Sequence, residues 1–418
     1  MPAIQEEEKK SVPGELDGFE LWDGERDRGT VRIGWSGDRI ESVEPASARH
    51  AGLAVIPGLI DTHVHLDTHV LSGAGPGDAW PLVTPPEEKA VHVLGHALRF
   101  AAYGVTTIRD LAASTVQIAV GRALEERAVP GPRLLTCASV GMTAGHGDLF
   151  TPPRFRDRPP VADSPDECRA LVRAWAREGA DGIKIYTSGG VLSMGDQVRW
   201  RNHTRAEISA TIDEAHALGM LVAAHSHTPE GIDIALEEGA DSIEHATGMT
   251  LGQVGVLASR QVPIAPTLLV NDLLATGGDG IRPEAQRKAA AIVAGREAVL
   301  HAAGQAGVRF ILGTDANGRF VRHGGQLLEM RRMGEALGWS AERVIRAATS
   351  DAAAAIGMGA SLGRVAPGFA PDLVVVRGRP WLDLAELTPE NIVAVICRGQ
   401  LISGRVPGCD TTKGPQSS

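Results

Sequence analysis

Near both ends of the chain, apolar and polar residues alternate in short runs. Between Gly18 and Val55 these runs are separated by turn pairs such as Asp23-Gly24. A period of two between turn residues predicts antiparallel β-strands. The expected strands cover residues 19–22, 31–35, 40–43, 373–376 and 392–396. We therefore predict that residues 13–57 and 360–410 join in one small β-sandwich domain. Two unrelated β segments are the alternative.

Between residues 58 and 359 a different unit repeats. A helix-like stretch ends at a glycine, and a short apolar run follows that ends in a polar residue. Glycine commonly ends helices because it adopts the left-handed conformation at little cost. Repeated alternation of helix and strand implies a parallel sheet with crossover helices, and about eight strands would close it into a (β/α)8 TIM barrel. The glycines are Gly104, Gly179, Gly219, Gly239 and Gly307.

An open, doubly wound sheet is the alternative arrangement for such a pattern. The chain has no G-x-G-x-x-G after the first expected strand, and this favours the closed barrel. Residues 1–12 and 411–418 lack apolar patterning and are expected to be flexible tails. The sequence thus predicts an α/β protein with a barrel over residues 58–359 and a smaller β-domain made from both chain ends.

The overall composition narrows the classes of partner. The 418 residues carry a formal net charge of −10, and 43% of them are hydrophobic, as in ordinary soluble proteins. Without a Lys/Arg-rich stripe, neither nucleic acid nor a membrane surface is an expected partner. No apolar stretch approaches the roughly 18–20 residues of a membrane span, and no signal core begins the chain, so a cytoplasmic location is expected. The 4 cysteines form no CxxC pair and are expected to be reduced.

Four histidines follow apolar runs at positions where barrel strands should end. His63 and His65 are two residues apart, so an extended strand points both side chains to the same face. His225 and His245 each end a later run. Imidazole is a common ligand of zinc and similar ions, and the carboxyl ends of barrel strands meet at one face. These histidines predict a metal site, whereas Asp61 is expected to stabilise the turn beside it.

Lys184 stands between Ile183 and Ile185 in another expected strand. A buried ammonium beside metal cations would be costly. A neutral amine that captures carbon dioxide becomes an anionic carbamate, whose oxygens can bridge two metal ions. An ammonium paired with an acidic group is the alternative. Asp315 follows the last expected strand, where it can contact a metal and its bound water and transfer protons.

With these residues in this order, the sequence resembles the binuclear-metal branch of the amidohydrolase superfamily, which has a carboxylated lysine. The resemblance extends from Leu21 to Ile402. Residues 141–147, 183–191, 224–227 and 242–247 are most similar to the Xaa-Pro/Xaa-Arg dipeptidase (prolidase-like) group, which includes ochratoxin-hydrolysing amidases. The resemblance implies two divalent metal ions, with zinc expected and Mn, Co and Ni left open. The implied ligands are His63, His65, Lys184, His225, His245 and Asp315.

The resemblance also suggests residues that contact substrate. His146 would orient the scissile carbonyl or the substrate carboxylate, and a simple loop histidine is the alternative. His227 is a second candidate for catalysis and substrate contact, or else a surface histidine. Tyr186 would shape the pocket. Arg319 and Arg322 are candidate carboxylate partners, with solvated surface side chains as the alternative.

Together these features predict a metal-dependent hydrolase of small-molecule amides. A hydroxide bridging two metal ions would attack the carbonyl, and Asp315 would carry the proton to the leaving nitrogen. The expected substrates are dipeptides or N-acyl amino acids with a free carboxylate, ochratoxin-type amides included. A cyclic amidase or lactonase of the same superfamily is the alternative. A deaminase fits less well because of Lys184, and a non-catalytic homologue because all six ligands are present. The resemblance favours a homo-oligomer, with an octamer as one candidate size.

Overall fold

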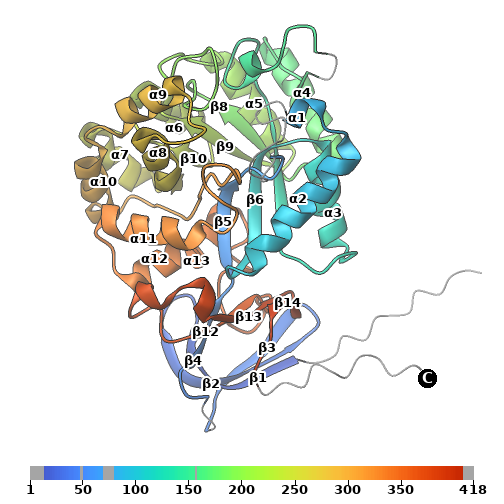
Figure 1. Ribbon diagram of the computed structural model, residues 1–418, viewed down its shortest axis with the longest axis vertical. Helices are drawn as coiled ribbons and strands as arrows, with labels where there is room; N and C mark the ends of the chain where they lie inside the picture. The colour runs from blue at the N-terminus through green and yellow to red at the C-terminus, as the bar shows by residue number, and fades with distance from the viewer. Residues whose placement is uncertain (1–13, 48–49, 69–79, 156–157, 408–418) are drawn as a thin grey trace, which may run out of the picture.

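The computed structural model describes residues 14–47, 50–68, 80–155 and 158–407, and it contains two β-sheets, one of them surrounded by helices (Figure 1). The expected tails, residues 1–12 and 411–418, lie outside the described residues. Among the described residues, no helix is long and apolar enough to cross a membrane. The two sheets are the frame on which the candidate site is built.

The smaller sheet is made from both ends of the chain and has seven strands in the order β14-β13-β12-β4-β1-β2-β3. The predicted strands at both ends are therefore confirmed, and they share one sheet. Their bounds are β1 (Gly14–Trp22), β2 (Asp27–Ser36), β3 (Arg39–Pro45), β4 (Leu53–Pro57), β12 (Leu373–Arg377), β13 (Ile392–Cys397) and β14 (Gln400–Gly404).

Strand β4 joins the two ends of the chain. It pairs parallel with β1, where Val55 faces Leu21, and antiparallel with β12, where Val55 faces Val375. Hydrogen bonding is therefore continuous from the N-terminal strands to the C-terminal strands. The described strands form one sheet, whereas the sequence predicted a sandwich. Both halves contribute to one core cluster, which includes Phe19, Ile33 and Ile396.

The second sheet has seven parallel strands that follow one another in chain order, from β5 to β11. Crossover helices cover it, as the alternating pattern predicted (Figure 1). The strand bounds are β5 (Leu59–Val64), β6 (Val105–Ala113), β7 (Arg133–Ser139), β8 (Gly182–Tyr186), β9 (Leu221–Ser226), β10 (Ser242–His245) and β11 (Ile264–Ala265).

The eighth position of this sheet is occupied by an irregular segment, residues 308–316. Single parallel bridges join Phe310 to Ile264 on one side and Ala316 to Val64 on the other. Asp315 has a φ of 53°, outside the extended region, and this breaks the regular ladder. The structure is therefore a nearly closed barrel of seven strands, and the eighth regular strand expected from the sequence is absent from the described residues.

The helices end where the sequence placed their stop signals. Gly179 and Gly239 are the C-caps of α4 and α6, with φ values of 92° and 88°, and the other three predicted glycines also have positive φ. The helix bounds are α1 (Trp80–Val83), α2 (Pro86–Ala101), α3 (Thr115–Glu125), α4 (Pro165–Glu178), α5 (Arg205–Ala217), α6 (Pro229–Glu238), α7 (Leu251–Arg260), α8 (Leu268–Thr276), α9 (Pro283–Val293), α10 (Arg296–Gln305), α11 (Gln326–Leu337), α12 (Ala341–Ala347) and α13 (Ser350–Ala355).

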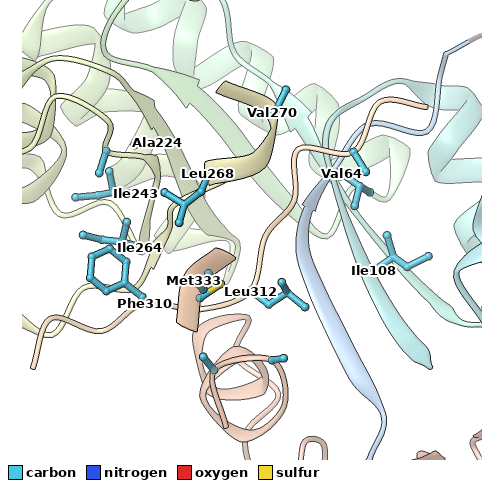
Figure 2. Packing of buried hydrophobic residues seen from close by; sticks show 14 of the residues in the cluster. Val64, Ile108, Ala224, Ile243, Ile264, Leu268, Val270, Phe310, Leu312 and Met333 are labelled. Carbon is cyan, nitrogen blue, oxygen red and sulfur yellow. The ribbon is translucent and has the colours of Figure 1, made fainter. Parts of the chain in front are cut away.

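One large apolar core fills the space between the barrel strands and the helices. Phe310 and Leu312 of the irregular segment belong to it, together with Ile264 of β11 and Met333 of α11 (Figure 2). Val64, between the two first-strand histidines, is fully buried in the same cluster. This packing fixes the strand ends that carry the polar residues of the site.

Candidate metal centre

Two groups of potential metal ligands lie at the carboxyl ends of the barrel strands. In each group, the ligand atoms all lie within 4.8 Å of one another. We call the group of His63, His65 and Asp315 the first cluster, and the group of His225, His227 and His245 the second cluster. Five of the six predicted metal ligands fall into these clusters, and His227 joins the second.

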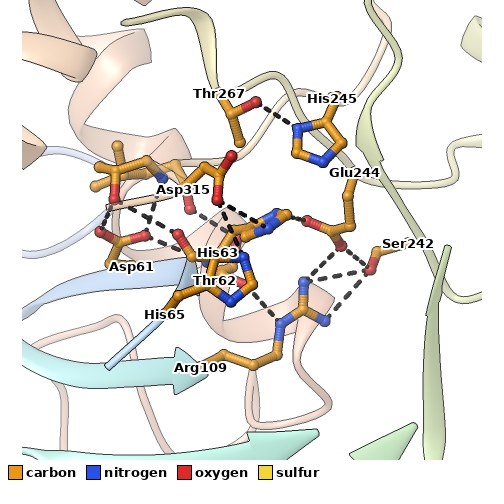
Figure 3. A network of polar contacts seen from close by, with 12 residues as sticks. Asp61, Thr62, His63, His65, Arg109, Ser242, Glu244, His245, Thr267 and Asp315 are labelled. Atoms are coloured by element: carbon orange, nitrogen blue, oxygen red, sulfur yellow. Dashed lines mark hydrogen bonds and ion pairs between the residues drawn. The ribbon is translucent and has the colours of Figure 1, made fainter. Parts of the chain in front are cut away.

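In the first cluster, Asp315 faces both histidines of the first strand. Its Oδ1 atom lies 3.1 Å from Nε2 of His65 and 3.7 Å from Nε2 of His63 (Figure 3). The backbone N–H of Asp315 donates to the carbonyl of His63 at 2.8 Å. The irregular segment thus brings the carboxylate to the end of β5, although no regular strand carries it.

Several site residues have a left-handed backbone. His245, Thr267 and Asp315 have φ values of 71°, 45° and 53°. Such a conformation is unfavourable for residues other than glycine and persists only where surrounding contacts enforce it. The strained residues therefore lie in or beside the two clusters. Their left-handed backbone gives the side chains directions that a regular strand would not.

Lys184 is buried in β8 and is 2% exposed. Its Nζ atom has no hydrogen-bond partner among the described residues. Burial lowers the pKa of Lys184 to about 8, so a neutral amine is accessible near neutral pH. Its charge also lowers the pKa of His63 and of His225, after the larger effect of burial, so it acts on both clusters.

Glu244 orients His63 and is itself held by Arg109. The Nδ1–H of His63 donates to Oε2 of Glu244 at 2.7 Å, which leaves Nε2 for a metal (Figure 3). Nη2 of Arg109 donates to Oε1 of Glu244 at 2.9 Å, and the hydroxyl of Ser242 donates to the same oxygen at 2.6 Å. Burial opposes ionisation, but Arg109 and His63 hold the pKa of Glu244 below its usual range.

The histidines of the second cluster also have outer partners. Nδ1 of His245 lies 2.7 Å from the hydroxyl of Thr267, and Nδ1 of His227 lies 3.0 Å from that of Thr247. These contacts leave the Nε2 atoms of both rings for a ligand. The Nε2–H of His225 instead donates to the carbonyl of Gly189 at 3.2 Å, which leaves its Nδ1.

Two buried carboxyl groups stabilise the segments that carry the site residues. Glu329 of α11 accepts the N–H groups of Leu268 and Leu269 at 2.6 and 2.8 Å, so it caps α8 directly after Thr267. Burial raises the pKa of Glu329 to about 8. Asp61 accepts hydrogen bonds from the backbone N–H and the hydroxyl of Thr314 at 3.1 and 2.7 Å, so it ties β5 to the irregular segment. This is the stabilising role expected for Asp61.

Comparison with known proteins places the chain in a family. Residues 54–402 match the family model described as "Amidohydrolase family". This chain belongs to the amidohydrolase family. The match covers most of the chain, and the two clusters lie within it. The amidohydrolase is therefore a hydrolase acting on amide bonds, in a family that generally uses metal ions.

Individual relatives agree with this assignment. The amidohydrolase is 28% identical over 378 residues to ochratoxinase from Aspergillus niger, covering 85% of this chain and 77% of that protein. The crystal structure of a Xaa-Pro dipeptidase with methionine bound in its active site superposes with a TM-score of 0.84 at 29% identity, covering 93% of this chain and 99% of that one. The crystal structure of a prolidase complexed with N-methylphosphonate-L-proline superposes with a TM-score of 0.83 at 28% identity, covering 94% of this chain and 100% of that one.

The residues predicted to contact substrate occupy different positions in the amidohydrolase. The ring of His146 stacks on that of His225 with a centroid distance of 4.3 Å. Tyr186 is buried beside His146, and its hydroxyl lies 2.7 Å from that of Ser139. Arg319 and Arg322 are exposed. Nη2 of Arg319 donates to the carbonyl of Gly280 at 3.0 Å, and its guanidinium lies over the ring of Phe320.

Sequence reasoning missed the outer partners of the histidines. Glu244 precedes His245 directly, and a charged residue inside a buried strand was an available signal for a paired role. Arg109 carries the same signal in β6. Thr247 and Thr267 carry no such signal, because a threonine near a strand end is common and its partner lies elsewhere in the chain.

Proposed function

We propose that this amidohydrolase binds two divalent metal ions, zinc being the expected metal, and hydrolyses amide bonds of dipeptides or N-acyl amino acids that have a free carboxylate. The observation that carries the proposal is Lys184. Its amine is buried, unpartnered among the described residues, and close enough to both clusters to lower the pKa of histidines in each. A buried amine without a partner is unfavourable unless another group completes it.

Conversion of the Lys184 amine to a carbamate would remove the cost of burying an amine without a partner. The neutral amine adds to carbon dioxide and releases one proton, and the product has two oxygens that could reach an ion in each cluster. The remaining donors are imidazole nitrogens and one carboxylate, which suit zinc and similar ions. The donor set therefore fits two ions, held by His63, His65, Asp315, His225, His245 and the modified Lys184.

Bound ions would supply a nucleophile from water at neutral pH and polarise the scissile carbonyl. The protein residues would transfer the proton and orient the histidine rings. Asp315 contacts both histidines of the first cluster, and its side chain is 14% exposed, so solvent reaches part of it. We assign it the transfer of a proton from the attacking water to the leaving nitrogen. Glu244 and Thr267 would keep the rings of His63 and His245 in the orientation that binds metal.

The substrate class is supported by the relatives and by the histidines around the second cluster. The similar proteins include a dipeptidase with methionine bound in its active site, a prolidase complexed with a proline derivative, and an ochratoxinase. The names of the dipeptidase and the prolidase structures each involve an amino acid or its derivative. His146 and His227 flank His225 and are the candidate contacts for the carbonyl or carboxylate of such a substrate.

The test is a hydrolysis screen with zinc-loaded protein. Dipeptides and N-acyl amino acids are compared with lactones and cyclic amides, and Asp315→Asn serves as the blank. Cleavage of amides with a free carboxylate, lost in the variant, is the expected result. Exclusive opening of rings would replace the proposal with a cyclic amidase or lactonase of the same family, and amide cleavage unchanged in Asp315→Asn would overturn the role of Asp315.

A further inference from the structure

The loop that follows β8 folds back against the second cluster. Gly189 donates its N–H to the carbonyl of Trp200 at 2.8 Å, so residues near 200 return to the end of the strand. A Cβ atom on Gly189 would lie 2.1 Å from the carbonyl oxygen of Gln197, which only glycine avoids. This return brings Asp196 and Asn202 beside His146, which comes from the loop after β7.

The ring of His146 sits in a space that only glycine leaves open. A Cβ atom on Gly190 would lie 1.9 Å from Cε1 of His146 and 2.2 Å from its Nδ1. The backbone N–H of His146 donates to Oδ1 of Asn202 at 2.6 Å. The ring therefore packs against Gly190 and stacks on His225, and the returning loop fixes the backbone of His146.

Asp196 faces Nδ1 of this ring. Its Oδ2 atom lies 3.8 Å from Nδ1 and accepts hydrogen bonds from the hydroxyl of Ser193 at 2.6 Å and the N–H of Gly190 at 3.0 Å. Its Oδ1 atom accepts from Nζ of Lys288 at 2.9 Å. Asp196 is 3% exposed, and Lys288 in turn pairs with Glu284 at 2.8 Å. Burial alone would raise the pKa of Asp196, but these contacts lower it below its usual range.

The two nitrogens of the His146 ring have different surroundings. Nδ1 is buried and has no hydrogen-bond partner at the present distance, and among the described residues the facing acceptor is Asp196. Nε2 makes no hydrogen bond with the described residues and is not among the buried polar atoms that lack a partner. A distance of 3.8 Å is longer than a hydrogen bond, and contacts of this kind commonly tighten when a ligand binds.

We propose that Asp196 is a positioning residue that acts through His146. It accepts the Nδ1–H of the imidazole and so leaves Nε2 unprotonated and available to substrate. This inference rests on the proposed function for the role of His146, but the placement of Asp196 opposite Nδ1 is a property of the structure itself. In this proposal, Gly189 and Gly190 leave room for the returning loop and for the ring of His146, and the loop after β8 places Asp196 beside that ring.

The first measurement determines which ring nitrogen of His146 carries the proton. Zinc-loaded protein with ¹⁵N-labelled histidine is compared with its Asp196→Asn variant, and His146→Gln assigns the resonances. The proton is expected on Nδ1 in the native protein, and a substantial share of the Nε2–H form is expected in Asp196→Asn. If the variant does not fold, Gly190→Ala displaces the ring from an intact Asp196 and should change the same resonances. An Nε2–H ring in the native protein, or an Nδ1–H ring that persists in the variants, overturns the proposal.

The second measurement separates positioning from a structural role. On the best amide of the screen, Asp196→Asn should lower kcat/KM about 10- to 100-fold, as loss of an orienting partner typically does. The control is Asp163→Asn, whose exposed carboxylate accepts the hydroxyl of Thr143 at 2.7 Å, and it should change kcat/KM little. In a His146→Ala background, Asp196→Asn should cause no further loss, because both changes remove one unit. An additional loss in that background contradicts the proposal.

The two measurements distinguish failure of this inference from failure of the proposed function. If native protein cleaves no amide, the proposed function fails, and the ¹⁵N spectra still report whether Asp196 sets the His146 tautomer. If amides are cleaved but the spectra do not change in Asp196→Asn, the inference fails and the proposed function stands.

Discussion

The Nδ1–H of His63 donates a 2.7 Å hydrogen bond to Glu244, which follows it by 181 residues in the chain. Glu244 is adjacent to His245, a member of the other ligand cluster. The end of β10 therefore contributes a potential ligand to one cluster and the orienting partner of a potential ligand to the other. A displacement of this one strand end would disturb both clusters together.

The first prediction concerns this pair. Glu244→Gln should weaken zinc binding about 10- to 100-fold, because the amide is a poorer acceptor for His63 and leaves Arg109 without its ion pair. The measurement is competition with a chromogenic chelator. Glu237→Gln is the control, since Glu237 has a side chain that is 58% exposed and pairs with Arg205 at the surface. Equal zinc affinity in native protein and Glu244→Gln would falsify the orienting role.

The second prediction separates metal binding from proton transfer at Asp315. Asp315→Asn should lower kcat by a factor of about 10² to 10⁴, since the amide cannot accept the proton from water. Most of the metal should remain, because the histidines and Lys184 are intact. Turnover and metal content are measured on the same sample, with Asp213→Asn, at a side chain 69% exposed, as the control. Parallel loss of metal and activity would assign Asp315 a purely ligating role.

The third prediction concerns carbon dioxide. Metal-free protein should regain full zinc content and activity with zinc plus bicarbonate, and only partial content in buffer freed of carbon dioxide, because the buried amine of Lys184 needs the carbamate to bind metal. With ¹³C-bicarbonate, a carbamate resonance should appear in the native protein and be missing in Lys184→Arg. Complete reconstitution without carbon dioxide would exclude the modification.

The fourth prediction concerns the pH dependence of stability. Burial raises the pKa of Glu329 from its usual value of 4.5 to about 8, so between these values the folded state binds more protons than the unfolded state. The free energy of unfolding contributed by Glu329 therefore falls as pH rises through this window, by about 1.4 kcal/mol for each pKa unit. Glu329→Gln removes this dependence.

Thermal unfolding of metal-free protein at about pH 5 and about pH 8 measures the effect. The melting temperature of the native protein relative to Glu329→Gln should be lower at the higher pH. Glu335→Gln, at an exposed position on the same helix, should track the native protein at both values. A constant difference between native protein and Glu329→Gln would mean that Glu329 does not titrate in this range.

Much of the site could be predicted from the sequence because its signals are local. His63 and His65 lie at the end of an apolar run that became β5, and the glycine before each later run became a left-handed helix stop. Lys184 was recognisable as a charge inside an apolar strand, and the structure buries it in β8. Local pattern and tertiary structure agree at these positions.

The remaining features depend on contacts that no local pattern contains. The segment with Asp315 reads as a strand, but a left-handed residue and single bridges to its neighbours make it irregular. The partnership of Arg109 with Glu244 joins residues 135 positions apart. Asp196 reaches His146 only because the loop after β8 folds back on itself. Such relationships arise from packing, which apolar periodicity does not specify.

The position of β4 has a consequence for how the protein is made. This strand is bonded on one edge to β12, and Gly58, between β4 and β5, donates its N–H to the carbonyl of Asp372 at 2.8 Å. A nascent chain that has emerged only as far as residue 360 therefore contains every barrel strand that the structure describes, yet the edge of β4 that pairs with β12 is still open. The enzyme would reach its mature form only after translation of the last strands, and a chain interrupted before them would be exposed to association through that edge.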